Sequence, residues 1–114
     1  MLTEVASVPV LVHNAKKSAE WYHDKLGFDV SIQGHWVEVK PKISRTVIHL
    51  CEKCDAWGTD SPGGNTGISF NTGDKAKTYE ELKAKGVEFK VPLTTESWGT
   101  YAIFKDPDDN EFWL

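Results

Sequence analysis

At 114 residues, the chain is long enough to bury one hydrophobic core without disulfides or metal. Its 13 basic and 17 acidic residues give a formal net charge of -4, which lacks the cationic surplus of a nucleic-acid groove and weakly favours a neutral or cationic partner. The apolar fraction of 39% argues against disorder, and no apolar run reaches the roughly 20 residues of a membrane span. We therefore expect a single domain over residues 1–114, in the cytoplasm, with neither nucleic acid nor membrane as partner.

The first half of the chain predicts the order strand, helix, strand, strand, strand. Residues 5–12 alternate like a strand, and Pro9 within them is typical of a strand that is not fully paired. Asn14 is a suitable N-cap and Gly27 a suitable stop for a short amphipathic helix between them. Further extended runs follow at residues 28–32, 36–39 and 46–51.

The second half repeats this pattern after a stretch rich in Gly, Ser, Asp and Pro, residues 54–67. A strand around Ile68 and Phe70, a helix with Asp74 near its start and Gly86 past its end, and three extended runs at 87–91, 98–105 and 110–114 match the first half, displaced by about 60 residues. The sequence therefore predicts an α+β fold of two βαβββ modules with curved mixed sheets around a cleft. We place the modules at about residues 4–54 and 66–114, with a linker at 55–65.

One face of each predicted sheet must be covered by the helix of its module, which leaves the opposite face open. This open face mixes polar and apolar side chains, as ligand clefts do. Alternation assigns to it Ser7, Pro9, Leu11, Val47, His49, Cys51, Gly67, Ser69 and Asn71.

Two segments carry a family resemblance. Residues 7–28, SVPVLVHNAKKSAEWYHDKLGF, and residues 98–114, WGTYAIFKDPDDNEFWL, resemble the N-terminal and C-terminal signatures of the vicinal oxygen chelate superfamily. That superfamily holds glyoxalase I, extradiol dioxygenases, fosfomycin-resistance enzymes and bleomycin resistance proteins. The Val-Pro-Val opening, and Trp98-Gly99 shortly before DPDDN, are most similar to the bleomycin resistance branch.

The resemblance implies where a metal would be held in an enzyme of this superfamily. Such enzymes bind a divalent ion with side chains from four strands, and the matching positions here are Ser7, His49, Gly67 and Trp113. Of these, only His49 is a competent ligand. A shift of one residue would bring in Glu38 or Glu111, but it would also turn the side chain to the other face, and Glu111 lies two residues from Trp113. We therefore expect no catalytic residue, no metal and no other cofactor.

The bleomycin resistance branch implies a different mode of action. Its members are homodimers that exchange N-terminal strands and sequester a cationic, planar drug by aromatic stacking, without catalysis. The resemblance gives Pro9 as the place where the exchanged arm departs. It gives the ligand-binding residues as Trp98, His49, Trp113, Trp36 and Ser7.

Alternatives to this interpretation stay open. The chain could be a divalent-metal-dependent lyase of glyoxalase I type, or a structural or regulatory member that binds no ligand. Trp98 and Trp113 could pack a core or a dimer interface, and His49 could be a neutral histidine held by a neighbour.

Two further motifs have simpler interpretations than a functional site. Cys51 and Cys54 have the spacing of a redox or zinc pair, but they follow an extended run and lack a second ligand pair, so we expect two reduced thiols. The Asp106-Pro107-Asp108 stretch lacks the glycine and distal glutamate of a calcium loop, and predicts a tight turn.

Overall fold

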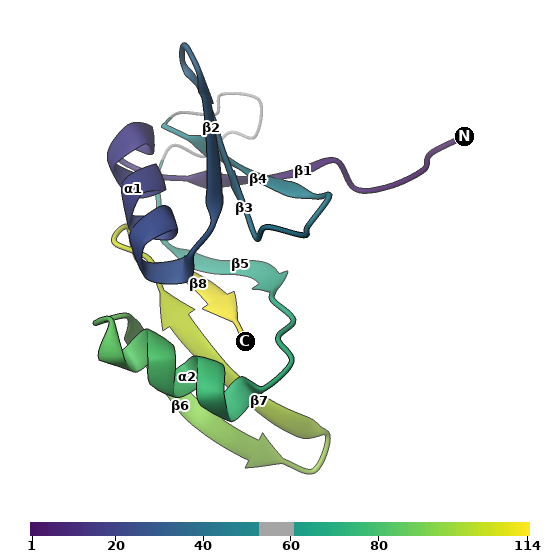
Figure 1. Cartoon of the computed structure of the whole chain (residues 1–114), viewed down its shortest axis with the longest axis vertical. Helices are drawn as coiled ribbons and strands as arrows, with labels where there is room; N and C mark the ends of the chain where they lie inside the picture. The colour runs from purple at the N-terminus through teal and green to yellow at the C-terminus, as the bar shows by residue number, and fades with distance from the viewer. Residues whose placement is uncertain (53–60) are drawn as a thin grey trace. The chain divides into compact units, whose positions relative to one another are not determined.

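The computed structural model describes residues 1–52 and 61–114, and Cys54 with most of the predicted linker lies outside these ranges. The chain forms two compact units, Met1–Pro62 and Gly63–Leu114, which we call the N-terminal and C-terminal units. Each unit contains one four-stranded mixed sheet and one helix (Figure 1). The predicted α+β fold of two βαβββ modules is confirmed.

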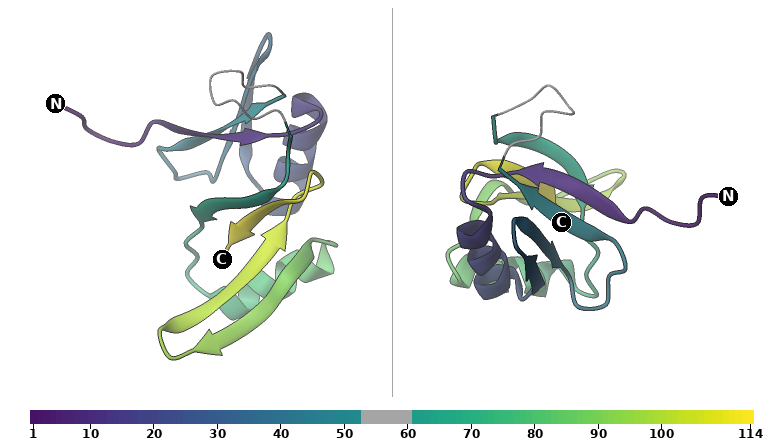
Figure 2. Two further views of the ribbon diagram at one scale, coloured as in Figure 1. Left: turned by 180° about the vertical axis from the view of Figure 1, so that it is seen from behind. Right: turned by 90° about the horizontal axis from the view of Figure 1, so that it is seen from above.

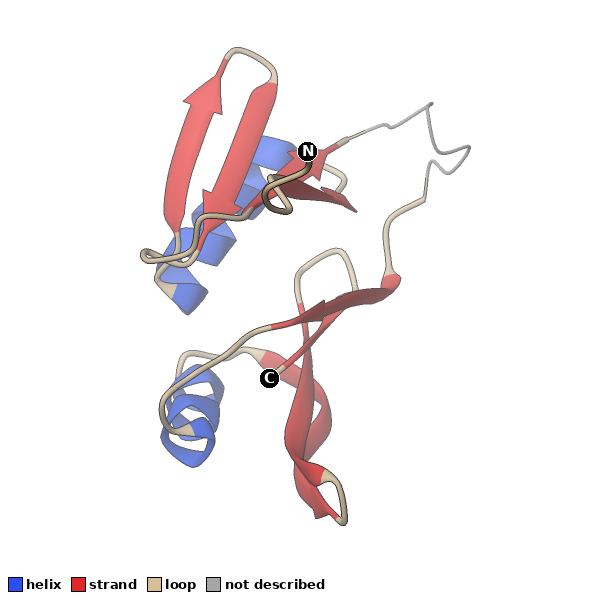
Figure 3. Cartoon of the chain, turned by 90° about the vertical axis from the view of Figure 1, so that its right-hand side faces the viewer, coloured by secondary structure: helices blue, strands red, loops and turns tan. Residues whose placement is uncertain are grey.

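The N-terminal unit places its strands in the order β1-β4-β3-β2, with β1 parallel to β4 and the other neighbours antiparallel. Helix α1 lies along one face of this sheet (Figure 3). Its elements are β1 (Ser7–Leu11), α1 (Ala15–Leu26), β2 (Asp29–Gln33), β3 (Trp36–Lys40) and β4 (Val47–Cys51).

Both ends of α1 are capped as the sequence predicts. The Asn14 side chain accepts a hydrogen bond from the Lys17 backbone N–H at 3.0 Å. Gly27 adopts a left-handed conformation (φ 70°), and its N–H donates to the carbonyl of His23. The helix thereby presents one apolar stripe to the sheet. The buried core of this unit contains Val10, Leu11, Val12, Ala15, Ala19, Tyr22, Phe28, Val37, Val39, Ile48 and Leu50.

Residues 1–6 precede β1 and are exposed (Figure 2). The segment contacts its own unit, since the Thr46 hydroxyl donates to the Val5 carbonyl at 2.6 Å and Arg45 pairs with Glu4 at 3.0 Å. Pro9 itself lies within β1, paired with His49 of β4. Exchange of this strand between subunits stays a prediction.

The C-terminal unit repeats the arrangement with strands in the order β5-β8-β7-β6, β5 being parallel to β8. Helix α2 packs on β6 and β7. The buried residues of this unit include Tyr79, Leu82, Ala102, Phe104, Phe112 and Leu114. Its elements are β5 (Gly64–Ser69), α2 (Lys75–Ala84), β6 (Glu88–Glu96), β7 (Gly99–Lys105) and β8 (Asn110–Trp113).

Two strands extend beyond the ranges that composition suggests. Strand β5 begins at Gly64, inside the predicted linker, because Gly64 donates to the Asp109 carbonyl at 2.9 Å and is thereby joined to the chain entering β8. Strand β6 continues past Val91 to Glu96, and Pro92 is tolerated because β6 is an edge strand. Pairing with a distant strand decides both boundaries.

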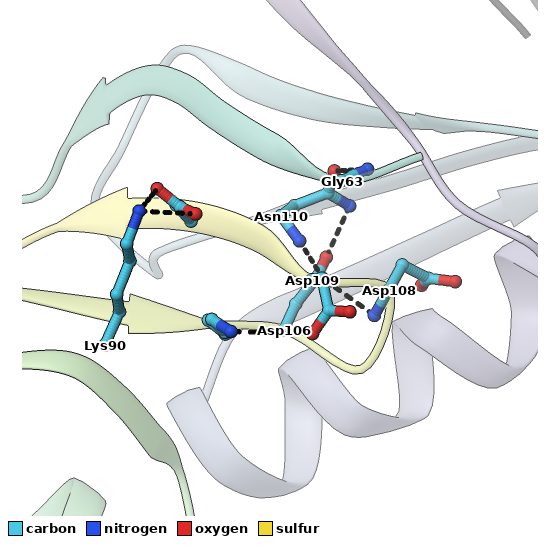
Figure 4. Close-up of polar contacts among 8 residues, drawn as sticks. Gly63, Lys90, Asp106, Asp108, Asp109 and Asn110 are labelled. Atoms are coloured by element: carbon cyan, nitrogen blue, oxygen red, sulfur yellow. Dashed lines mark hydrogen bonds and ion pairs between the residues drawn. The ribbon is translucent and has the colours of Figure 1, made fainter. Parts of the chain in front are cut away.

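The turn between β7 and β8 is a structural device (Figure 4). Buried Asp106 accepts hydrogen bonds from the backbone N–H groups of Asp108 and Asn110, each at 2.9 Å. Its second carboxylate oxygen accepts from the Asn110 side-chain amide at 2.9 Å, and that amide oxygen accepts from the Gly63 N–H at 2.9 Å. The predicted tight turn is confirmed, and it also fixes the start of β5. In the described ranges, no helix is long and apolar enough to cross a membrane.

Candidate functional site

The open face of the N-terminal sheet carries one row of paired residues across all four strands. Ser31 of β2 is paired with Glu38 of β3, Glu38 with His49 of β4, and His49 with Pro9 of β1. Directly paired residues share a face of the sheet, with Cβ atoms about 5 Å apart. Since the neighbouring rows Val10–Leu50–Val37 and Val8–Ile48–Val39 include the buried core residues, this row belongs to the face away from α1.

Trp36 and His49 form a stacked pair on this face, which we call the Trp36–His49 platform. Their ring centroids are 3.7 Å apart with an interplanar angle of 17°. The indole Nε1 of Trp36 donates to Oε2 of Glu38 at 2.9 Å, which restrains the indole in its plane. Trp36 remains 49% exposed, so the platform offers a flat aromatic surface with a carboxylate at its edge.

A pocket of about 770 Å³ adjoins the platform. Its walls come from the start of α1, the turn between β2 and β3, and the end of β4. Its volume is within the usual range for small-molecule sites. Among the lining residues are Asn14, Lys16, Gln33, His35, Trp36, His49, Cys51 and Glu52.

The environment of His49 favours the neutral imidazole. Burial lowers the pKa of His49 below its ordinary value of 6.5, and the negative charge of Glu38 acts in the opposite direction. The net direction is downward, so the ring is uncharged at neutral pH. Stacking with Trp36 is then an interaction of two uncharged aromatic rings.

The open face of the C-terminal sheet carries three aromatic side chains in mutual contact, which we call the aromatic cluster. Trp98 stacks on Tyr101 with centroids 5.0 Å apart, and Tyr101 stacks on Trp113 at the same distance, with interplanar angles of 29° and 25°. Trp113 alternates along β8 with buried Phe112 and therefore points away from the core. Trp98 is 65% exposed, which leaves a wide aromatic surface in contact with solvent.

The carboxylate on this second open face is already paired. Glu111, two residues before Trp113, accepts from Lys90 Nζ with both oxygens, each at 3.1 Å (Figure 4). The Glu111 side chain is 15% exposed, so this ion pair is partly shielded from solvent. The charge of Glu111 is thereby neutralised next to the aromatic cluster.

The structure brings the predicted aromatic residues together in two pairs. Trp36 contacts His49 in the N-terminal unit, and Trp98 lies near Trp113 in the C-terminal unit, with centroids 6.4 Å apart. Ser7 is exposed and paired with Val47, so it lies outside the row that holds His49.

Two residues of these surfaces are not among the ligand-binding residues that the sequence predicted. Tyr101 is the central ring of the aromatic cluster, and its alternation with Ala102 places it on the open face. Glu38 lies two residues after Trp36, so period-two alternation along β3 could have placed it beside the platform.

The residues at the four superfamily metal positions do not fit a divalent metal. Gly67 and Trp113 have no side-chain lone pair to donate, Ser7 is a poor ligand, and only His49 is suitable. Trp113 instead uses its ring in the aromatic cluster. Among the residues that the structure describes, no group of three or more His, Cys, Asp or Glu side chains is arranged to hold a metal ion.

Comparisons with known proteins agree on one family. A model of the Glyoxalase/Bleomycin resistance protein/Dioxygenase superfamily matches residues 4–114. The uncharacterized protein YetH of Bacillus subtilis (strain 168) is 32% identical over 120 residues, covering 100% of this chain and 98% of that protein.

Solved structures show the same relation. The crystal structure of a superfamily member from Sphaerobacter thermophilus DSM 20745 is similar with a TM-score of 0.86 and 32% identity, covering 99% of this chain and 96% of that one. The crystal structure of TnmS3, an antibiotic binding protein from Streptomyces sp. CB03234, is similar with a TM-score of 0.85 and 27% identity, covering 99% and 94%. With a family match along nearly its whole length, the chain belongs to the Glyoxalase/Bleomycin resistance protein/Dioxygenase superfamily.

Proposed function

We propose that this protein binds an antibiotic-like small molecule and sequesters it without catalysing its conversion. The observation that carries the proposal is the aromatic cluster of Trp98, Tyr101 and Trp113, stacked on an open sheet face with Trp98 65% exposed. Exposed aromatic surface of this kind marks binding sites more often than the ordinary protein surface. The likeness to TnmS3, an antibiotic binding protein, supports the same ligand class.

The chemistry of the cluster suits a flat, apolar ligand. Planar rings gain from offset stacking on tryptophan and tyrosine in addition to the area that they bury. The neighbouring carboxylate of Glu111 is paired with Lys90, which leaves no unpaired carboxylate of this residue to act on a bound molecule. The superfamily metal positions hold donors that do not fit a divalent ion, which favours binding over Lewis-acid chemistry.

The test is a titration of the purified protein with a panel of planar aromatic compounds, both neutral and cationic, with bleomycin included. Quenching of tryptophan fluorescence and isothermal titration calorimetry are expected to detect binding. Mass spectrometry of the recovered compound is expected to show it unchanged after prolonged incubation.

Matched variants assign the binding to the cluster. Trp98→Ala is expected to weaken binding about tenfold or more, because stacking of a planar ligand ring on one aromatic side chain contributes about 1–3 kcal/mol. Trp21→Phe is the control, since Trp21 lies in α1 and its ring contacts Tyr22 of the helix-side core. An equal loss of affinity in both variants would argue against the aromatic cluster as the binding site.

A product instead of unchanged compound would refute sequestration and favour the enzyme. The glyoxalase I alternative further requires turnover that depends on added divalent metal and is lost in His49→Ala. Failure of every compound to bind the folded protein would favour a structural or regulatory role.

We further propose that the protein acts as a homodimer in the cytoplasm. Sedimentation at several protein concentrations tests the dimer, and fractionation of cells tests the location.

A further inference from the structure

Trp98, the most exposed ring of the aromatic cluster, lies in the turn of the β6–β7 hairpin. Strand pairing closes with Glu96 opposite Gly99, so Ser97 and Trp98 alone form the connecting loop. Gly99 has a φ of 150°, which glycine adopts without strain and which lets the chain turn back directly after Trp98. We call residues 96–99 the hairpin tip, and the place of the Trp98 indole is set by the place of this tip.

The tip extends beyond the part of β7 that β8 supports (Figure 1). Strand β8 pairs with β7 from Ile103 to Lys105, whereas residues 99–101 of β7 pair with β6. Strand β6 is the edge strand of this sheet, so a two-stranded ribbon carries the tip. A two-stranded ribbon is only marginally stable by itself. Contacts from outside the ribbon therefore decide how firmly Trp98 is held.

Helix α2 supplies such a contact through Lys75, its first residue. Lys75 Nζ donates to the backbone carbonyl of Thr100 at 2.6 Å. Its positive charge makes this hydrogen bond stronger than one between neutral groups. Thr100 lies between Trp98 and Tyr101 in the sequence, and its hydroxyl is 3.1 Å from that of Thr95 on β6. The lysine thus joins the helix to the ribbon at the level of the cluster.

The start of α2 is itself fixed in place. The Asp74 side chain accepts a hydrogen bond from the Lys77 backbone N–H at 3.1 Å and caps the helix. The hydroxyls of Thr72 and Thr78 lie 2.6 Å apart and join the segment before the helix to its first turn. Lys75 therefore reaches the ribbon from an ordered support.

Resting on the small-molecule binding proposed above, we propose that Lys75 is a positioning residue for the aromatic cluster. Its ammonium holds the hairpin tip so that the Trp98 ring is in place before a ligand arrives. Ordering a loop or side chain during binding costs free energy, and a site that is in place beforehand avoids that cost. The apparent affinity falls in proportion to the fraction of molecules in which the site is in place.

The experiment uses N-methylacridone, an uncharged planar molecule, as the probe, so a change in protein charge acts little on it. Calorimetric titration gives its dissociation constant with the full-length protein. Lys75→Met keeps most of the aliphatic stem and removes the ammonium, whereas Lys75→Arg retains a charged donor. Lys77→Met is the matched control, because it removes the same charge from the same turn, about 200° around the helix from Lys75.

We expect Lys75→Met to weaken binding of the probe about threefold, as it would if the tip were in place in about a third of the molecules. Lys75→Arg is expected to restore most of the affinity, and Lys77→Met to leave it unchanged. In a Trp98→Ala background, Lys75→Met is expected to cause no further loss, because the lysine acts through the Trp98 ring.

A second measurement follows the ring itself in the protein without ligand. Each of the five tryptophans, labelled as 5-fluorotryptophan, gives a fluorine NMR resonance, and Trp98→Phe identifies that of Trp98. Lys75→Met is expected to narrow and shift the Trp98 resonance, because the ring becomes more mobile. The resonances of Trp21 and Trp36 in the N-terminal unit are expected to stay as they are, which also shows that the variant is folded.

The outcomes distinguish this inference from the proposed function. Equal affinities of Lys75→Met and Lys77→Met, or a further loss in the Trp98→Ala background, would overturn the role of Lys75 and leave ligand binding standing. If the unaltered protein binds neither N-methylacridone nor any compound of the panel, the proposed function fails. The fluorine resonance of Trp98 then still decides whether Lys75 holds the ring, and an unchanged resonance in Lys75→Met would overturn that.

Discussion

The Trp36–His49 platform and the aromatic cluster occupy the same kind of position, an open sheet face, in two units of the same topology. They differ in chemistry. The cluster joins three rings beside the Lys90–Glu111 ion pair, whereas the platform joins two rings beside Glu38, whose carboxylate accepts a hydrogen bond from the Trp36 indole. A repeated fold thus carries two aromatic surfaces whose neighbouring carboxylates have different partners.

The cluster can be broken at its central ring. Tyr101→Ala removes the ring on which both Trp98 and Trp113 stack. We expect affinity for an uncharged planar probe to fall about 30-fold, or about 2 kcal/mol. Calorimetric titration measures the change, and Tyr101→Phe, which retains the ring, is the control. Equal affinities of both variants would place the binding surface elsewhere.

The difference between the paired Glu111 and Glu38 can be removed by eliminating the ammonium group that pairs with Glu111. Lys90→Met keeps the aliphatic stem of the side chain but removes the ammonium that pairs with both oxygens of Glu111. We expect the affinity for a planar cation to rise about fivefold, or about 1 kcal/mol, because the cluster then has an unpaired carboxylate beside it. A double variant with Glu111→Gln should lose this gain. Persistence of the gain in the double variant would contradict the explanation.

The restraint on the platform can be tested through the Trp36 indole. Trp36→Phe keeps an aromatic ring near His49 and removes the hydrogen bond from Nε1 to Glu38. We expect the affinity for a planar cation to fall about threefold, because a hydrogen bond of this kind contributes about 0.5–1.5 kcal/mol. Titration calorimetry gives the value. An unchanged affinity would mean that the indole N–H does not matter for binding.

The smallest expected effect is on stability below neutral pH. The pKa of His49 is lower in the folded protein than in the unfolded chain, so the unfolded chain takes up more protons as the pH falls below 6.5. Well above pH 6.5 the imidazole is neutral in both states, so His49 does not make the stability depend on pH there. Acidification below that value destabilises the fold. Urea unfolding at several pH values should show a slightly shallower loss below pH 6.5 for His49→Gln than for the unaltered protein. A steeper loss in the variant would reverse the sign.

Much of the fold follows from local patterns. Asn14 and Gly27 mark the ends of α1 because a side-chain oxygen and a left-handed glycine satisfy the free backbone groups there. Alternation also assigns His49 to the face away from the helix. The start of strand β5 does not follow from local pattern, because Gly63 and Gly64 are typical of a linker. Their hydrogen-bond partners, Asn110 and Asp109, lie far along the chain.

The sequence by itself predicted the two βαβββ units, the helix ends, the family resemblance, and the open-face position of side chains such as His49. Only the tertiary structure decided which of these side chains meet. Stacking of Trp36 on His49 and pairing of Lys90 with Glu111 depend on how neighbouring strands are aligned. The physical reason is that alternation fixes the face of a residue from its own strand, whereas its neighbours are set by hydrogen bonding to strands that are distant in the sequence.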